Sequence, residues 1–254
     1  MRFFLAAVAA ALSLAAQEVP RPEYPQPQFQ REKWQSLNGP WEFDYDDSDK
    51  GISEKWPSTA RKFTRTIVVP FAPETKKSGI GDTTFHPVVW YRRSVTVPAD
   101  WKGQRVLIHF GAVDYQAQIW INGQKAGEHE GGNVPFHVDA SDFLKAGANT
   151  LVVRAEDPPT DRYIPRGKQY WEPKSRSIFY TRTTGIWQPV WMEAVGESFL
   201  RRVRVTPSVD GDVRFEATIS RPAEGVEFLA IVSAEKGNAE KRVVASATGL
   251  AEGS

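Results

Sequence analysis

The chain of 254 residues has no cysteine and almost no net charge. Without cysteine it can have neither a disulfide framework nor a lipid anchor attached to a cysteine near the N-terminus. Its 32 lysines and arginines nearly balance 31 aspartates and glutamates, which leaves a formal charge of +1. This composition gives no support for binding to nucleic acid or to an anionic membrane surface, so a neutral or small partner is expected.

The sequence signatures of several enzyme classes are also missing. No serine stands in a GxSxG elbow, and there is no phosphate-binding loop or dinucleotide fingerprint, which leaves acyl, phosphoryl and hydride transfer unsupported. None of the four histidines has an HExxH or other metal-ligand spacing. We therefore predict no metal and no cofactor, and expect His109 and His137, which lie in strand patterns, to have hydrogen-bonded structural roles.

The one long apolar run lies at the N-terminus. Met1–Phe4 carries a positive charge, Leu5–Leu14 is apolar and alanine-rich, and Ala15–Gln17 is a small-residue cleavage pattern, in the order typical of a signal peptide. A buried helix is the alternative, but four prolines follow within the next eleven residues, between Pro20 and Pro27. The run is too short to span a bilayer comfortably. We predict a signal peptide at residues 1–16 and a periplasmic or secreted protein without a membrane anchor.

Alternation of apolar and polar residues predicts an all-β protein. It begins between Trp34 and Tyr45 and recurs at Val95–Val97, Val106–Phe110, Ala117–Ile121, Phe136–Val138 and Leu151–Ala155. The sharpest local signal is Asn122-Gly123 between two such runs, because this pair supplies the two positive φ angles of a type I′ hairpin turn. No long stretch after the N-terminal run keeps a helical period.

Composition divides the chain into four segments. After residues 1–16 we expect an extended leader at 17–32, a β-sandwich domain at 33–196 and a second domain at 197–254. The second domain has strand-like runs at Leu200–Val205, Val213–Ile219, Val226–Val232 and Arg242–Ala247. An immunoglobulin-like sandwich needs about seven strands and about 100 residues, so we expect this domain to be partial, with an unpaired edge that favours association.

Four aspartates, Asp44, Asp46, Asp47 and Asp49, precede Gly51 and resemble a calcium loop in composition. The glycine is misplaced for an EF-hand, and Lys55 stands where a bidentate glutamate is required. We interpret the segment as a solvated turn.

The segment from Glu156 to Tyr180 is a long loop rich in charge, aromatic residues and proline, and loops of this length on a β scaffold are often functional. Sugars are bound by aromatic faces and by planar polar groups that contact neighbouring hydroxyls. The alternative is a seam that packs on a neighbouring domain. Five strand-context tryptophans, Trp41, Trp90, Trp120, Trp187 and Trp191, are expected to be core or half-buried. The candidate substrate-binding residues of the loop are Asp161, Arg166, Lys168, Gln169, Tyr170 and Trp171.

A series of motifs in order along residues 33 to 195 resembles the N-terminal region of family 2 glycoside hydrolases, the family of β-galactosidases, β-glucuronidases and β-mannosidases. The motifs are Ser36-Leu37-Asn38-Gly39-Pro40-Trp41-Glu42-Phe43, Val89-Trp90-Tyr91-Arg92-Arg93, Gly111-Ala112-Val113-Asp114-Tyr115 through Trp120-Ile121-Asn122-Gly123, Val134-Pro135-Phe136, Asn149-Thr150-Leu151 and Thr184-Gly185-Ile186-Trp187-Gln188-Pro189-Val190-Trp191. The resemblance implies a jelly-roll, galactose-binding-like β-sandwich followed by the start of an immunoglobulin-like domain.

The resemblance also implies where the chemistry lies. In that family two glutamates of a TIM barrel act as acid/base and nucleophile, and a retaining glycosidase holds two such carboxyls about 5 to 5.5 Å apart. No barrel is expected in this chain, so we assign no catalytic residue. Loops of the first domain in this family reach towards the barrel's active-site mouth, and the candidates here are Asp82–Pro87 and Asp157–Tyr180.

The expected function is therefore that of the non-catalytic front portion of an exported, retaining β-glycosidase. Its expected partners are a β-glycoside carbohydrate and the C-terminal catalytic barrel of the same polypeptide, and a homo-oligomer is a further possibility. A stand-alone carbohydrate-binding module and a purely structural docking domain are the alternatives.

Overall fold

The computed structural model describes residues 18–221, 227–234 and 242–250. The predicted signal peptide at residues 1–16 lies outside these residues. Within them the secondary structure is almost entirely β, and the helical elements are short 3-10 turns: η1 (Pro27–Phe29), η2 (Lys76–Ser78) and η3 (Ala99–Trp101). None of the described helices is long and apolar enough to cross a membrane.

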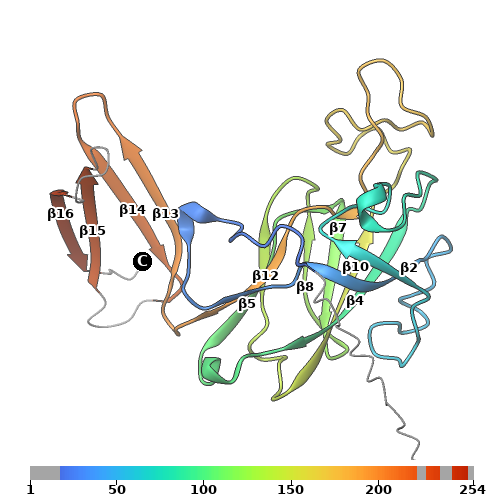
Figure 1. Cartoon of the computed structure of the whole chain (residues 1–254), viewed down its shortest axis with the longest axis horizontal. Helices are drawn as coiled ribbons and strands as arrows, with labels where there is room; N and C mark the ends of the chain where they lie inside the picture. The colour runs from blue at the N-terminus through green and yellow to red at the C-terminus, as the bar shows by residue number, and fades with distance from the viewer. Residues whose placement is uncertain (1–17, 222–226, 235–241, 251–254) are drawn as a thin grey trace, which may run out of the picture.

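Two antiparallel sheets form the first unit (Figure 1). The smaller sheet has the spatial order β1 (Trp34–Ser36), β12 (Val190–Val195), β5 (Arg105–Phe110) and β9 (Phe136–Asp139). The larger has the order β3 (Arg65–Val69), β2 (Gly39–Tyr45), β4 (Val88–Thr96), β10 (Ala148–Glu156), β7 (Gln116–Ile121) and β8 (Gln124–Glu130). The short strands β6 (Val113–Asp114) and β11 (Gly185–Ile186) pair with each other at one end.

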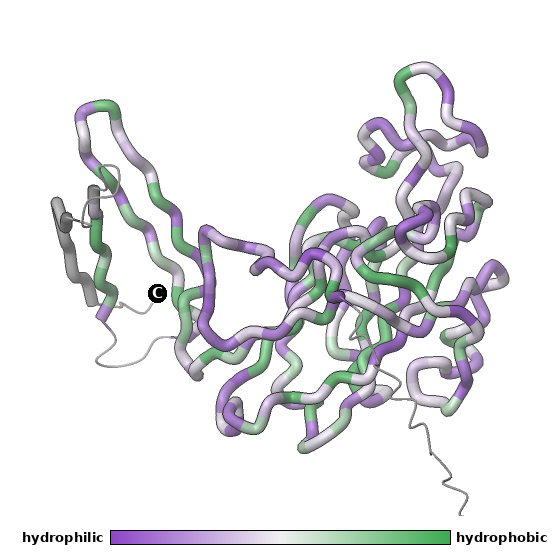
Figure 2. Tube along the Cα trace, in the orientation of Figure 1, coloured by the Kyte–Doolittle hydropathy of each residue, from purple (hydrophilic) through white to green (hydrophobic). Residues whose placement is uncertain are grey.

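Alternation along the strands produces the core, because successive side chains of a strand face opposite sides of its sheet. In β10 Leu151, Val153 and Ala155 enter the main core, as do Ala117, Ile119 and Ile121 in β7. Hydrophobic segments follow these strands in Figure 2. The predicted sandwich is confirmed, and Trp41, Trp90, Trp120 and Trp191 are all buried, while Trp187 is half-buried.

The segment Trp34–Tyr45 is divided between the two sheets, which alternation alone did not reveal. β1 pairs with β12, whereas β2 pairs with β3 and β4. The buried side chain of Asn38 stands at the break: its Oδ1 accepts a hydrogen bond from Val190 N at 2.9 Å, and its Nδ2 donates to the carbonyl of Pro20 at 3.1 Å. One asparagine therefore fixes both the sheet crossing and the path of the leader.

The predicted hairpin turn is confirmed. Asn122 and Gly123 have φ angles of 51° and 81°, and Ile121 pairs with Gln124 on either side of them. The Asn122 side chain also accepts a hydrogen bond from Thr150 N at 3.0 Å and donates to the Phe143 carbonyl at 2.8 Å. Asparagine is thus favoured here both by the left-handed turn and by these contacts.

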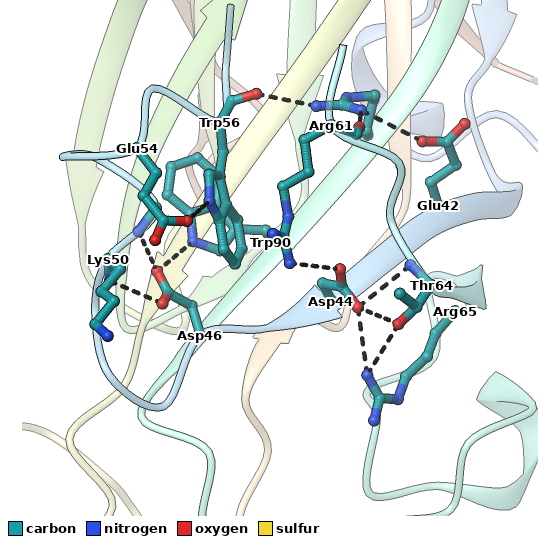
Figure 3. A network of polar contacts seen from close by, with 12 residues as sticks. Glu42, Asp44, Asp46, Lys50, Glu54, Trp56, Arg61, Thr64, Arg65 and Trp90 are labelled. Carbon is teal, nitrogen blue, oxygen red and sulfur yellow. Dashed lines mark hydrogen bonds and ion pairs between the residues drawn. The ribbon is translucent and has the colours of Figure 1, made fainter. Parts of the chain in front are cut away.

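A second, smaller core covers the outer face of the larger sheet. The loop between β2 and β3 places Trp56 and Phe63 against Trp90 and Trp120, whose rings stack at 5.4 Å. Arg61 lies 3.8 Å above the Trp56 ring, with Trp90 beside it (Figure 3). The part of this face around Trp90 and Trp120 is therefore covered by the loop rather than solvated.

The interpretation of the aspartate-rich segment as a solvated turn is wrong for Asp44 and Asp46, which are buried. Asp46 accepts hydrogen bonds from the backbone of Lys50 and Gly51, each at 2.8 Å, and from Trp90 Nε1 at 3.0 Å (Figure 3). Asp44 accepts a hydrogen bond from the Thr64 hydroxyl at 2.6 Å. These carboxylates fasten the covering loop to the sheet, whereas Asp47 and Asp49 are exposed.

Two hairpin-like pairs follow the sandwich. β13 (Leu200–Pro207) pairs with β14 (Val213–Ile219), and β15 (Glu227–Ala234) pairs with β16 (Arg242–Leu250). These ranges agree closely with the predicted strand runs, except that Val226 lies outside the described residues. The boundary predicted at residue 196/197 falls between the end of β12 and the start of β13 and stays a prediction.

Candidate functional site

The two candidate loops meet at one end of the sandwich, and a single arginine joins them. Arg182, at the end of the loop between β10 and β11, is only 2% exposed. Its guanidinium donates to the carbonyls of Thr83 and Thr84 and lies 4.2 Å from the centre of the Phe85 ring. The segment at residues 82–87 and the long loop therefore form one structural unit, which stands above the sandwich in Figure 1.

A buried polar cluster lies below this junction. Thr184 donates from its hydroxyl to Asp157 at 3.2 Å and from its backbone nitrogen to Glu74 at 3.3 Å. Burial raises the pKa of Glu74 to about 7, although hydrogen bonds from Thr184 and the charge of Arg182 oppose the shift. Burial also raises the pKa of Asp157, against the charge of Arg166. Burial disfavours the ionised form of a carboxyl group, and here it outweighs the neighbouring cations.

Asp114, at the end of β6, belongs to the same region. Its pKa is raised to about 6, first by burial and then by the charge of Asp157, whereas the hydrogen bond from Gln169 acts in the opposite direction. The Gln169 amide donates to Asp114 Oδ2 at 2.6 Å, and its carbonyl oxygen accepts from Thr183 N at 2.6 Å. A Cβ at Gly132 would lie 2.1 Å from Asp114 Oδ1, so glycine is required beside this carboxylate.

The first half of the long loop is closed around Arg166. This side chain is 8% exposed, and its guanidinium donates to the carbonyls of Pro158 and Asp161 and lies 3.7 Å from the Asp157 carboxylate. The Asp161 side chain accepts a hydrogen bond from Tyr163 N at 2.8 Å and shapes the next turn. Arg166 and Asp161 thus hold the loop in its conformation.

The second half of the loop is built on three aromatic rings. Tyr170 stacks on Phe179 at 5.0 Å, and Trp171 contacts both rings edge-on. The backbone of Tyr170 donates to the Tyr180 carbonyl at 2.9 Å, which pairs the two arms of the loop. Loops on rigid scaffolds often carry binding residues, and here the packing of the three rings holds the loop in one conformation.

The outer surface of the loop carries apolar side chains in solvent. Tyr163 is 99% exposed, Tyr180 64% and Ile178 62%, although much of the surrounding loop is hydrophilic (Figure 2). Lys168 lies 5.9 Å from the Tyr180 ring, and Arg162 lies 4.4 Å from the Trp171 ring. Exposed aromatic rings flanked by cations suit recognition of a sugar or of another protein surface.

The structure places all six predicted substrate-binding residues on this loop and separates them into two groups. Arg166, Gln169 and Tyr170 are turned into the loop or its base. Asp161 and Trp171 are half-buried and Lys168 is exposed, so these three reach the surface of the loop. Substrate binding by the six residues stays a prediction.

Sequence reasoning missed the residues that hold the loops in place. Glu74 and Arg182 are 108 positions apart, and no spacing rule connects them. Asp114 and Gln169 were each noticed, one in a family motif and one as a candidate, but their contact was not predicted. Their positions could be linked only through the pairing of β6 with β11, which brings distant segments together.

Comparison with known proteins gives a consistent result. Residues 34–172 match the family described as glycosyl hydrolases family 2, sugar binding domain. The β-glucuronidase of Canis lupus familiaris is 29% identical over 214 residues, which cover 74% of this chain and 32% of that protein. A β-galactosidase of Thermoanaerobacter pseudethanolicus is 26% identical over 196 residues, covering 76% of this chain and 24% of that protein.

Solved structures support the same fold. A β-glucuronidase from an uncultured Clostridium sp. superimposes with a TM-score of 0.66 at 28% identity and covers 86% of this chain and 38% of that one. The Ruminococcus gnavus β-glucuronidase in complex with D-glucaro 1,5-lactone has a TM-score of 0.68 at 22% identity, covering 89% and 39%. The chain thus spans between about a quarter and two fifths of the length of these relatives.

Proposed function

Because this chain belongs to glycoside hydrolase family 2, we propose that it is the N-terminal, non-catalytic portion of an exported, retaining glycosidase that acts on β-glycosides. The match over residues 34–172 carries this proposal, together with relatives named β-glucuronidase and β-galactosidase. The matched stretches make up 32% and 24% of those two relatives, which supports a catalytic barrel in the length that this chain does not cover.

The role of this portion is to shape the sugar site from outside the barrel. The two loops joined by Arg182 form a rigid projection whose exposed surface carries Tyr163, Lys168 and Tyr180. Trp171 contributes the exposed part of its ring, while Arg166, Gln169 and Tyr170 keep the projection in shape. A positioned loop of this kind contributes to binding and orientation of the substrate rather than to bond cleavage.

Export is the second part of the proposal and is supported by the order of charge, apolar run and small residues at 1–16. A fusion of residues 1–30 to a reporter that is active only outside the cytoplasm tests it directly. Signal is expected for this fusion, and an Arg2→Glu, Leu5→Glu double variant is expected to abolish it. A silent wild-type fusion would contradict export.

The decisive experiment concerns the coding frame and the activity of its complete product. The frame is expected to continue past codon 254 into a barrel with two strand-end glutamates. The product should hydrolyse an aryl β-glucuronide, β-galactoside or β-mannoside, and proton NMR should show the β-anomer as the first sugar product, which identifies retention. A stop codon directly after Ser254 would contradict the proposal.

The loop's role is separable from catalysis in that complete enzyme. Tyr180→Ala removes an exposed ring and is expected to raise KM about tenfold or less with little change in kcat. This is the effect of losing a contact that stabilises the bound substrate and the transition state equally. Ile52→Ala, an exposed apolar residue on a different loop, is the matched control. An unchanged KM in the Tyr180 variant would assign the loop to interdomain packing.

The exposure of Tyr163 and Tyr180 also favours a second candidate, a carbohydrate-binding module that acts alone. Calorimetric titration of the chain with galactose, glucuronate and mannose distinguishes the two. Heat of binding at millimolar sugar that Trp171→Ala abolishes without loss of stability supports the module. Absence of heat, with Trp171→Ala affecting only stability, identifies the loop as an interdomain seam.

A further inference from the structure

A groove lies on the far side of the smaller sheet from the larger one, where the leader, the sandwich and β13 meet. Its volume is about 130 Å³. Figure 1 shows the leader, in blue, between β13 and the sandwich. Its basic lining residues are Arg31 of the leader, His109 of β5, His137 of β9 and Arg201 of β13, and the rings of Phe29 and Phe136 line it as well. Junctions between structural units are common places for ligand sites.

The polar side chains of this lining are almost all basic. Arg31, His109, His137 and Arg201 contribute two guanidinium and two imidazole groups, and none of the lining residues is an aspartate or glutamate. Phenylalanine rings and Leu107 form the rest of the wall. In such apolar surroundings a cation interacts more strongly with an anion than it does in water.

The carboxylate of Glu193 lies beneath the groove, and donors from the protein already occupy its hydrogen-bond acceptor positions. Glu193 accepts hydrogen bonds from Arg31 Nε at 2.9 Å, from Trp191 Nε1 at 2.8 Å and from the Tyr24 hydroxyl. His109 Nε2 lies 3.1 Å from the same carboxylate. Burial opposes ionisation of Glu193, but hydrogen bonding and charge from His109, with the bonds from Tyr24 and Trp191, lower its pKa to about 2. Glu193 therefore neutralises Arg31 and does not neutralise Arg201.

Arg201 and His137 are the basic groups left for a ligand. Arg201 is exposed, and no hydrogen bond or ion pair joins its guanidinium to another of the described residues. The pKa of His137 is lowered by burial first and then by His109 and Arg201, while Asp139 and Glu193 oppose the shift. Asp139 is itself bound by Arg105 at 2.9 Å. An anion between His137 and Arg201 would relieve the repulsion between them.

We infer that this groove is a binding site for a small oxyanion, a sulfate or carboxylate group either free or carried on a sugar, held by Arg201 and His137 against the phenyl wall. The site is separate from the loops described above, since its residues lie on the leader, β5, β9 and β13. Because the ligand contacts both units, binding stabilises their association by mass action.

Sulfate is the first probe, because its charge does not change between pH 5.5 and 8. The full chain, with histidine side chains labelled with nitrogen-15, is titrated with sodium sulfate at pH 6 and constant ionic strength. Saturable shifts of the His137 resonances are expected, and Arg201→Gln should weaken binding about tenfold, the usual effect of losing one charge-assisted hydrogen bond. Arg202→Gln, the adjacent exposed arginine outside the groove, is the matched control and should leave the affinity unchanged.

Acid should strengthen binding. His137 is neutral at pH 8 and gains a proton as the pH falls, so sulfate affinity should rise between pH 8 and 5.5, and His137→Gln should abolish that rise while retaining weak binding through Arg201. His109, Arg31, Asp139 and Glu193 face the same histidine and remain in both proteins. A pH dependence that persists in His137→Gln would overturn the role of His137.

Titrations with glucuronate and with glucose distinguish a free oxyanion from one carried on a sugar. Binding of glucuronate more tightly than sulfate, with none of glucose, indicates an anionic sugar, whereas sulfate alone indicates a free anion. Linear, unsaturable shifts, or equal losses in Arg201→Gln and Arg202→Gln, would overturn the site. These outcomes do not depend on glycosidase activity.

Discussion

The side-chain amide of Gln169 donates a hydrogen bond of 2.6 Å to the carboxylate of Asp114, 55 positions earlier in the chain. This contact fastens the long loop to the end of a core strand. The other end of the same amide accepts from Thr183 N, so one side chain connects both arms of the loop to the sandwich. The conformation of the projecting loop therefore depends on Gln169, whose side chain is turned into the base of the loop.

Replacement of Gln169 should loosen the loop. Gln169→Ala leaves the Asp114 carboxylate and Thr183 N without this partner, at an expected cost of about 1–3 kcal/mol in the free energy of unfolding. Urea denaturation measures the stability, and limited proteolysis within residues 157–182 measures the local order. Lys168→Ala, at the exposed neighbouring position, is the control. Equal protease resistance in the two variants would contradict the role of Gln169.

The contribution of Glu74 and Asp114 to stability should fall as the pH rises from about 5 to 8, whereas His137, whose pKa is lowered, contributes in the opposite direction. The pKa of Glu74 is raised from 4.5 to about 7 and that of Asp114 from 3.8 to about 6. Between the unfolded and folded pKa values the folded state binds more protons than the unfolded state, so increasing pH reduces the free energy of unfolding. For Glu74 alone the loss is roughly 3 kcal/mol at most, at about 1.4 kcal/mol per pKa unit.

Glu74→Gln should remove most of the Glu74 contribution to this pH dependence and increase stability at pH 8, because the amide carries no charge and its oxygen can still accept from Thr184 N. Denaturation at pH 5, 6.5 and 8 checks the slope. Glu172→Gln, at an exposed position of the long loop, should retain the slope of the wild type. A slope unchanged by Glu74→Gln would show that Glu74 is not responsible.

Gly132→Ala should be more harmful than Gly147→Ala. At Gly132 a Cβ would lie 2.1 Å from Asp114 Oδ1, and Asp114 is held by Gln169, so the expected loss is about 2 kcal/mol or more. At Gly147 the φ angle is +83° but the surrounding space is open, so only the backbone cost of about 1 kcal/mol applies. Thermal denaturation compares the two variants, and an equal loss would contradict the packing argument.

Asp46→Ala should release the loop that covers the outer face of the larger sheet. The change leaves the backbone donors of Lys50 and Gly51 and the indole N–H of Trp90 without their acceptor, at an expected cost of about 3 kcal/mol. Tryptophan fluorescence should shift to longer wavelength as Trp56 and Trp90 become hydrated. Ser48→Ala, at an exposed position in the same turn, should change neither observable.

The histidines and acidic residues show how far local patterns reach. His109 was expected to have a hydrogen-bonded structural role. Its ring stacks on Trp191 at 4.8 Å and its Nε2 lies 3.1 Å from Glu193, but that nitrogen has no hydrogen bond of good geometry among the described residues. Its position on the wall of a groove with Arg201 was not predicted, since these residues are 92 positions apart. Similarly, Asp44 and Asp46 looked like a solvated turn because the aromatic residues that cover them come later in the chain.

The sequence by itself determined the strands, the Asn122-Gly123 turn and the family, because these depend on alternation, local backbone angles and ordered motifs. Because successive side chains of a strand point to opposite faces, Leu151, Val153 and Ala155 share one face whatever the position of the strand in the sheet. Only the tertiary structure decided that Arg182 joins the two loops, that Gln169 contacts Asp114, and that Glu74 is buried enough for its pKa to rise to about 7. Such contacts depend on which strands become neighbours, and desolvation depends on everything packed around a group, so no local pattern encodes either.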